Sequence, residues 1–333
     1  MINKDSRKLI NEIDEKVDVL ENRIIDLDEE ILDLLLIDRT TNSNILWCTD
    51  SYSKLGDKYS YKSTIERELI TAKNGNIIKP RTKKNYAEKK RRVKEKGEVF
   101  TPSWVCNHQN NLVDNAWFGQ ENLFNYETDK SWVVNPKKIQ FINRDWKEFV
   151  KDLRIEITCG EAPYIVSRYD TVSNEIIETL NRIGILDRKI RVVNENVSEF
   201  KEWYKWIKIA YQSVYGYEWQ GDSLLIAREN LLYSFVDYYE ERFGSKPTII
   251  ELKEIADIIS WNFWQMDGLK GVVPQSCDNE KIVQYDLFGD SIIEKCIGCT
   301  NLDITKHNGA FCNIKDWENR KIVKFVNLLK GGK

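Results

Sequence analysis

Three carboxylates in this sequence belong to short apolar runs, at positions where a nucleotide-like ligand needs hydrogen-bond acceptors. Glu156 lies in the run before Gly160, Glu218 lies near the end of the run SVYGYEWQ, and Asp267 ends the run SWNFWQMD. In an open parallel sheet, ligands bind beyond the carboxyl ends of the strands. We therefore expect Glu156 to face an amino-acid ammonium, Glu218 to accept from ribose hydroxyls, and Asp267 to accept from the exocyclic amine of adenine.

The stretch EITCGEAPYIV, residues 156–166, predicts a strand that stops at a glycine and turns into a helix. Gly160 and Ala162 are small enough to let the backbone approach a ligand, and a helix N-terminus presents free N–H groups. Ala162 suits such a loop only if its φ is negative. Because the chain has no GxGxxG pyrophosphate turn, these groups fit S-adenosylmethionine better than NAD. Taken alone, they equally suit a plain strand–turn–helix of any α/β protein.

A second group of candidate functional residues lies near the C-terminus, namely Cys296, Cys299, His307 and Cys312. Three cysteines and one histidine form a standard closed, tetrahedral zinc site, which is structural rather than catalytic. Buried, unliganded thiols are the alternative. The cysteine count of seven is odd, which argues against a secreted disulfide framework.

The N-terminal residues 5–37 show the most regular pattern of the chain. Apolar residues recur at spacings of three and four, at Ile10, Ile13, Val17, Leu20, Ile24, Leu27, Ile31 and Leu34. This heptad seam predicts one long helix, which either packs on its own domain or forms a coiled-coil arm that pairs with another chain. Residues 1–38 contain 12 acids and 5 bases, so this negatively charged arm is not expected to bind DNA.

Residues 79–96 reverse this charge, with 10 bases and 2 acids. Such a run is either a solvated, mobile face or a contact to DNA phosphates. Further along the chain, helices are expected at 146–150, within 171–212, at 223–241 and at 249–259, and strands at 213–220 and 260–267.

Four motifs, in order, carry a resemblance to a known family: FTPSWVCN (100–107), EITCGEAPYIVSRYD (156–170), YGYEWQGDSLLIAREN (215–230) and NFWQMDGLKGVVP (262–274). With them, residues 35–330 resemble adenine-specific DNA methyltransferases of restriction–modification systems, of the restriction subunit M type. The resemblance implies that Phe100, Thr101 and Pro102 help to hold the methionine end of the cofactor.

The sequence departs from this family at the catalytic motif. These enzymes carry Asn-Pro-Pro-Tyr or Asn-Pro-Pro-Phe on the strand after the adenine-binding acid, where it holds the flipped target base. This chain has six prolines and no Pro-Pro pair. The missing motif therefore implies that a second chain supplies the acceptor site, and the heptad arm is a natural means of recruiting it. The alternative is a catalytically inactive, methyltransferase-like DNA-binding or regulatory subunit.

The predicted organisation is an α/β protein built around a Rossmann-like, S-adenosylmethionine-dependent core at 96–275. A coiled-coil arm (1–38) and a turn-rich, basic connection (39–95) precede the core, and a Cys/His tail (276–333) follows it. Predicted partners are double-stranded DNA and a second subunit, or a second copy bound through residues 5–37. No run of about 18 apolar residues and no apolar signal segment is present, so we expect a cytoplasmic protein that does not contact a membrane.

Overall fold

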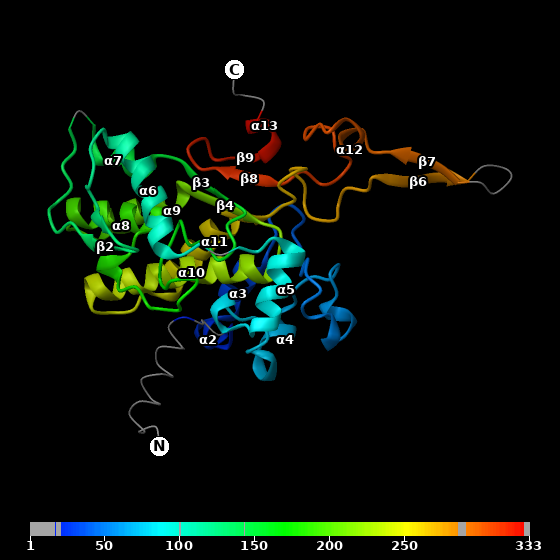
Figure 1. Cartoon of the computed structure of the whole chain (residues 1–333), viewed down its shortest axis with the longest axis horizontal. Coiled ribbons are helices and arrows are strands. Elements are labelled where there is room, and N and C mark those ends of the chain that lie inside the picture. Colours follow the sequence, from blue (N-terminus) through cyan, green and yellow to red (C-terminus); the bar gives the residue numbers. More distant parts are fainter. Residues whose placement is uncertain (1–16, 18–20, 100, 143, 286–290, 330–333) are drawn as a thin grey trace.

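The computed structural model describes residues 17, 21–99, 101–142, 144–285 and 291–329, which fold as a mixed α/β protein with small sheets (Figure 1). The helices are α2 (Glu21–Leu27), α3 (Glu29–Leu36), α4 (Arg67–Ile70), α5 (Tyr86–Lys96), α6 (Ser103–Phe118), α7 (Trp146–Lys151), α8 (Ile185–Asn196), α9 (Phe200–Gln212), α10 (Gly221–Phe243), α11 (Ile249–Asn262), α12 (Ile297–Asn301) and α13 (Phe325–Leu328). The strands are β1 (Asn125–Thr128), β2 (Ser131–Val134), β3 (Arg154–Ile157), β4 (Val214–Glu218), β5 (Phe263–Gln265), β6 (Glu280–Tyr285), β7 (Ser291–Lys295), β8 (Asn313–Asp316) and β9 (Lys321–Lys324).

The central sheet is parallel and contains β3, β4 and β5 in that order. Helices α8 and α9 connect β3 to β4, and α10 and α11 connect β4 to β5, as parallel pairing requires a crossover connection. The carboxyl ends of the three strands therefore lie at one edge, where Glu218 ends β4. Strand β3 forms one side of the sheet, and its residues Ile155 and Ile157 are 46% and 65% exposed.

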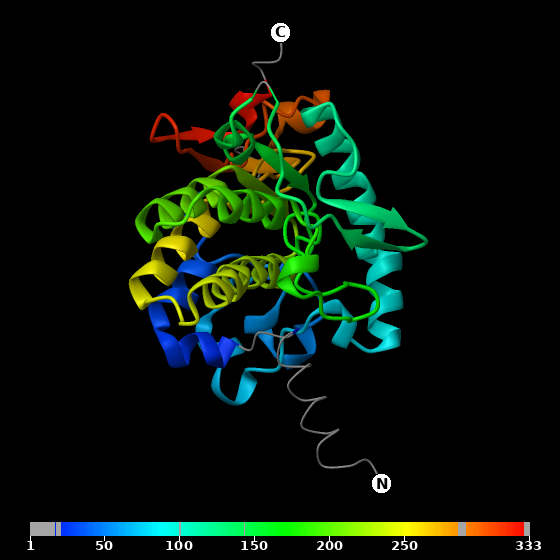
Figure 2. The ribbon, with the colours of Figure 1, turned by 90° about the vertical axis from the view of Figure 1, so that its left-hand side faces the viewer.

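Helices cover one face of this sheet, and the C-terminal tail covers the part of the other face that β4 and β5 form (Figures 1 and 2). On the helical side, α10 is buried around almost its whole circumference, which identifies it as the central helix of the core. On the tail side, Phe325 packs against the rings of Tyr217 and Trp264 at centroid distances of 6.2 and 5.5 Å. Residues from β4, β5 and β8 join them in a second apolar cluster.

The N-terminal heptad segment does not form one continuous helix in its described part. Asp28 has an extended backbone with φ of −171° and caps α3, because its carboxylate accepts a hydrogen bond from Glu30 N. The break separates α2 from α3. Ile24 and Ile31 are fully buried in the main core of the chain, as are Leu35 and Leu36. Residues 21–36 thus pack on their own domain, and a seam through residues 5–16 lies outside the described residues.

Several elements agree with the sequence-based expectations. The predicted helices at 146–150, 223–241 and 249–259 correspond to α7, α10 and α11, and two helices, α8 and α9, occupy 185–212. Thr248 begins α11 with a reciprocal cap, since its hydroxyl accepts from Glu251 N while the Glu251 carboxylate accepts from Thr248 N. None of the described helices is both long and apolar enough to cross a membrane.

Candidate functional site

A cleft of about 620 Å³ opens at the carboxyl ends of β3 and β4. Its walls come from four segments that are distant in the sequence, which contribute Tyr61, Gly97, Glu98, Val99, Thr101, Glu156, Ile157, Thr158, Cys159, Gly160, Pro163, Tyr164, Glu218, Trp219, Gln220 and Ser223. Its position is the one at which an open parallel sheet binds its ligand. The volume lies in the usual range for small-molecule and cofactor sites.

The cleft contains buried acceptor oxygens that lack a donor. Glu98 Oε1, Glu156 Oε2 and Gln220 Oε1 are buried oxygens that have no hydrogen-bond partner within the described part of the chain. Glu218 adds a third carboxylate, and no lysine or arginine occurs among the described lining residues. Buried acceptors are costly unless a donor reaches them. The cleft therefore suits a ligand that donates hydrogen bonds or carries positive charge, and it disfavours a phosphate.

The loop that follows β3 adopts an unusual backbone. Thr158, Gly160 and Ala162 have φ values of +49°, +54° and +60°, so alternate residues lie in the left-handed region. The expectation of a negative φ at Ala162 is therefore wrong. Ala162 is fully buried and lies behind the cleft rather than in its wall. The backbone tolerates it because the Ala162 carbonyl accepts from Ile165 N and Val166 N, which ties the turn closed.

The expected helix after this loop is also absent. Residues 161–168 form turns, and the next helix, α8, begins at Ile185. No helix N-terminus therefore faces the cleft from this loop. Gly160 N instead donates to Glu218 Oε2 at 2.9 Å, which joins the ends of β3 and β4 across the cleft floor.

Burial raises the pKa of both predicted carboxylates in the cleft. For Glu156, removal from water raises the pKa well above its ordinary value, although the backbone N–H groups of Tyr164 and Ile165 act in the opposite direction. For Glu218, burial also raises the pKa, and this effect outweighs the backbone hydrogen bonds from Gln220 and Gly160, which lower it. A cationic ligand would offset this cost, because it favours the ionised carboxylates.

Four of the eight residues predicted for cofactor binding line the cleft together: Thr101, Glu156, Gly160 and Glu218. Pro102 is the residue before α6 and does not line it, and Phe100 lies outside the described residues. Asp267 follows β5 and its carboxylate accepts from Leu269 N at 3.0 Å. It does not line the cleft; burial raises the pKa of the lining residue Tyr61, and the charge of Asp267 adds to that effect.

The sequence-based analysis missed several lining groups. Glu98 lies two residues before the motif at 100–107, and Gln220 lies inside the motif at 215–230, two residues after Glu218. Tyr61 comes from a segment in which no chemistry was found. Together with Tyr164 and Trp219 it adds aromatic surface to the cleft.

The basic run of residues 79–96 is partly structural. Lys84 and Arg92 are buried, and both contact the fully buried carboxylate of Asp222 in α10, at 3.2 and 2.9 Å. Arg92 also pairs with Glu98 in the cleft wall. Lys90 and Lys94 of α5 are exposed. Part of the run thus anchors α5 beside the cleft, and part of it faces solvent.

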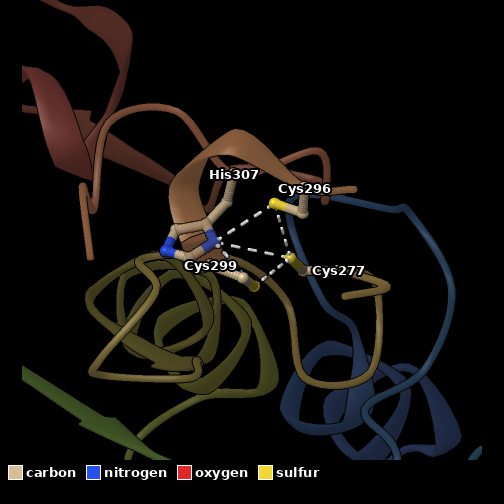
Figure 3. Close-up of side chains that lie close together, drawn as sticks. All are labelled: Cys277, Cys296, Cys299 and His307. Atoms are coloured by element: carbon tan, nitrogen blue, oxygen red, sulfur yellow. Dashed lines mark hydrogen bonds between the residues drawn. The ribbon is translucent and has the colours of Figure 1, made fainter. Parts of the chain in front are cut away.

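The C-terminal tail brings together Cys277, Cys296, Cys299 and His307, a group that could hold a metal ion (Figure 3). Cys277 Sγ lies 3.6 Å from the sulfur atoms of Cys296 and Cys299 and 3.4 Å from His307 Nδ1. Cys277, which the sequence-based analysis overlooked, thus takes the place expected for Cys312.

Cys312 faces the central sheet instead. It is fully buried, its thiol donates to Gln265 O at 3.4 Å, and it packs in the apolar cluster with Tyr217 and Trp264. The prediction of Cys312 as a ligand is wrong because Phe311, one residue earlier, bridges to Val272 and directs this segment toward the core.

Comparison with known proteins gives no assignment. No family model matches the chain, and no curated protein or solved structure matches it significantly. The function must therefore be argued from the cleft itself.

Proposed function

We propose that this chain is the S-adenosylmethionine-binding part of an adenine-specific DNA methyltransferase of a restriction–modification system. The observation that carries the proposal is the cleft beyond β3 and β4, where three carboxylates and an unpartnered amide oxygen meet without any cation among the described lining residues. S-Adenosylmethionine bears an ammonium, a sulfonium and two ribose hydroxyls, which match these acceptors. A pyrophosphate cofactor such as NAD has no comparable match, since its charge is negative.

The lining residues have distinct roles in this proposal. Glu156 and Glu98 would face the ammonium and the sulfonium, Glu218 would accept from the ribose hydroxyls, and Thr101 would orient the methionine end. When bound, the cofactor supplies an electrophilic methyl group. The chain itself contributes position and a partly desolvated pocket, which are the main requirements of an in-line transfer. Asp267, which the resemblance assigns to the adenine, follows β5 and does not line the cleft, so the proposal gives it no contact with the cofactor.

Double-stranded DNA is the proposed methyl acceptor. Helix α5 carries the exposed Lys90 and Lys94, and the chain passes from its end directly into the cleft wall at Gly97 and Glu98. Lysines at this position would neutralise phosphates next to the cleft and displace counterions from the DNA.

The proposal includes a second chain that supplies the acceptor site, because no Asn-Pro-Pro motif occurs in the sequence. Among the described heptad residues, Val17, Ile24 and Ile31 are buried and Leu34 is partly buried, whereas Leu27 is 44% exposed, so most of this seam is not available to recruit that chain. Strand β3 is a better candidate surface. It is an edge strand of a parallel sheet, and apolar side chains are exposed at Ile155 and Ile157 within it and at Leu153 just before it. Such edges accept an added strand.

Radiolabelled methyl transfer tests this proposal. The full-length chain is incubated with duplex DNA and labelled S-adenosylmethionine, alone and with the product of the adjacent reading frame. Transfer only in the presence of that product supports the divided enzyme, and transfer by the chain alone refutes the division. Cofactor binding without transfer under either condition favours the second candidate, an inactive methyltransferase-like subunit, which the missing Asn-Pro-Pro motif also supports.

A further inference from the structure

We propose that Cys277, Cys296, Cys299 and His307 bind one Zn²⁺ ion, and that this ion holds the base of the β6–β7 hairpin. Cys277 precedes β6, Cys296 follows β7, Cys299 lies in α12, and His307 belongs to the loop after α12. One ion would thus join three separate parts of the tail. This inference is independent of the methyltransferase proposal.

The distances among the four ligand atoms fit tetrahedral zinc. With bonds of about 2.3 Å to sulfur and about 2.05 Å to nitrogen, tetrahedral angles require S···S separations of about 3.8 Å and S···N separations of about 3.5 Å. Cys277 Sγ lies 3.6 Å from both other sulfurs, the three S···N distances are 3.4, 3.6 and 3.5 Å, and all four ligand atoms lie within 4.8 Å of one another. A disulfide would require about 2.05 Å between sulfurs. All four donors therefore surround a space of the size that one ion fills.

The backbone around the cluster is shaped for this close approach. A Cβ atom on Gly298 would lie 2.6 Å from His307 N, and one on Gly309 would lie 2.9 Å from Cys277 N. Any side chain at either position would clash with these backbone atoms, so both positions require glycine. Gly298 brings α12 against the histidine, and Gly309 brings the following loop against Cys277.

The surrounding segment lacks an apolar core of its own. Among residues 276–280 and 293–310, whose burial the structure describes, only Cys296, Gly298 and His307 are buried, and two of these are proposed ligands. Figure 1 shows the β6–β7 hairpin extending away from the body of the protein. A segment with so little buried apolar surface needs another source of stability, and a bound metal supplies it.

The donor set selects the metal and its role. Three thiolates and one imidazole are soft and borderline ligands that suit Zn²⁺, whereas Mg²⁺ and Ca²⁺ prefer oxygen. Four protein ligands complete a tetrahedron and leave no position for water or substrate. The site is therefore structural, and its expected effect is on the folding of residues 276–310.

Metal analysis and cobalt substitution of the full-length protein test this site. We expect about one equivalent of zinc per chain, and a Co²⁺-substituted protein with the visible bands of tetrahedral thiolate coordination. Cys277→Ser should lose the metal or distort the cobalt spectrum. Cys312→Ser, the matched control at a buried cysteine outside the cluster, should keep both the stoichiometry and the spectrum.

Limited proteolysis gives a readout that does not depend on the variants being well folded. Removal of the metal from wild-type protein with a strong chelator should expose residues 276–310 to cleavage, while the region of β3, β4 and α10 remains protected. Well under one equivalent of metal in the wild type, with no tetrahedral cobalt spectrum, would overturn the proposal. So would retention of metal by Cys277→Ser together with its loss from Cys312→Ser.

Discussion

Replacement of Asp222 in α10, the buried partner of Lys84 and Arg92, by asparagine should destabilise the protein. The Asp222 side chain is fully buried and accepts from Tyr52 Oη at 2.9 Å, from Lys84 Nζ at 3.2 Å and from Arg92 Nη1 at 2.9 Å. Its pKa lies well below the ordinary value, because the charges of Arg92 and Lys84 outweigh the effect of burial. The carboxylate is therefore ionised in the folded protein at all ordinary pH values.

The substitution preserves shape and removes charge. It leaves the buried Arg92 with Glu98, and the buried Lys84 with the nearby carboxylate of Glu161, as neighbours of opposite sign. Removing one partner of a buried ion pair costs about 3–5 kcal/mol, because the other charge stays desolvated. We expect a loss of this size in the free energy of unfolding, measured by urea denaturation followed by circular dichroism. Helix α5 should detach first, since Arg92 ties it to α10 and Lys84, two residues before it, contacts the same carboxylate.

Glu68→Gln is the matched control. The Glu68 side chain is 74% exposed and lies 3.8 Å from the Arg67 guanidinium, so its removal should leave the urea midpoint unchanged. A loss below about 1 kcal/mol for Asp222→Asn would refute the reasoning, because it would mean that Lys84 and Arg92 reach water or other partners when the carboxylate is gone.

Two further predictions concern the cleft and its approach. Affinity for S-adenosylmethionine should increase as pH rises from about 4.3, the ordinary glutamate value, through the raised pKa values of Glu156 and Glu218. The reason is that a cationic ligand binds the ionised carboxylates. Calorimetry at a series of pH values measures this affinity, and an affinity that does not change with pH would contradict the prediction. Replacing Lys90 and Lys94 by alanine should weaken binding to duplex DNA and reduce the slope of log affinity against log salt by about two, whereas the same change at Lys201 and Lys205 of α9 should not.

The sequence was sufficient to predict elements that depend on local pattern. Helix α10 could be anticipated because apolar residues cover it, and α11 because Thr248 and Glu251 provide a reciprocal cap. The prediction of one continuous helix through the heptad segment is wrong in its described part, for a local reason that the apolar spacing does not show. Asp28 is a strong helix N-cap, and it starts a new helix in the middle of the seam.

The candidate site was predictable where it depends on strand ends and unpredictable where it depends on tertiary contacts. Glu156 and Glu218 lie together because parallel strands end at one edge. Tyr61 reaches the cleft from a distant segment, and no spacing rule connects it with β4. Cys277 was overlooked for a similar reason, since 18 residues of hairpin separate it from Cys296 and only the pairing of β6 with β7 brings the two together.

The most direct test of the central claim is calorimetric titration of the full-length protein with S-adenosylmethionine, with ATP as the anionic comparison. We predict saturable binding of S-adenosylmethionine to one site and no measurable binding of ATP. Glu156→Gln should weaken the binding at least tenfold, because a hydrogen bond to a charged group contributes about 1.5–3 kcal/mol, and Glu68→Gln should not change it. Absence of binding at millimolar S-adenosylmethionine, or equal binding of ATP, would contradict the proposed role of the cleft.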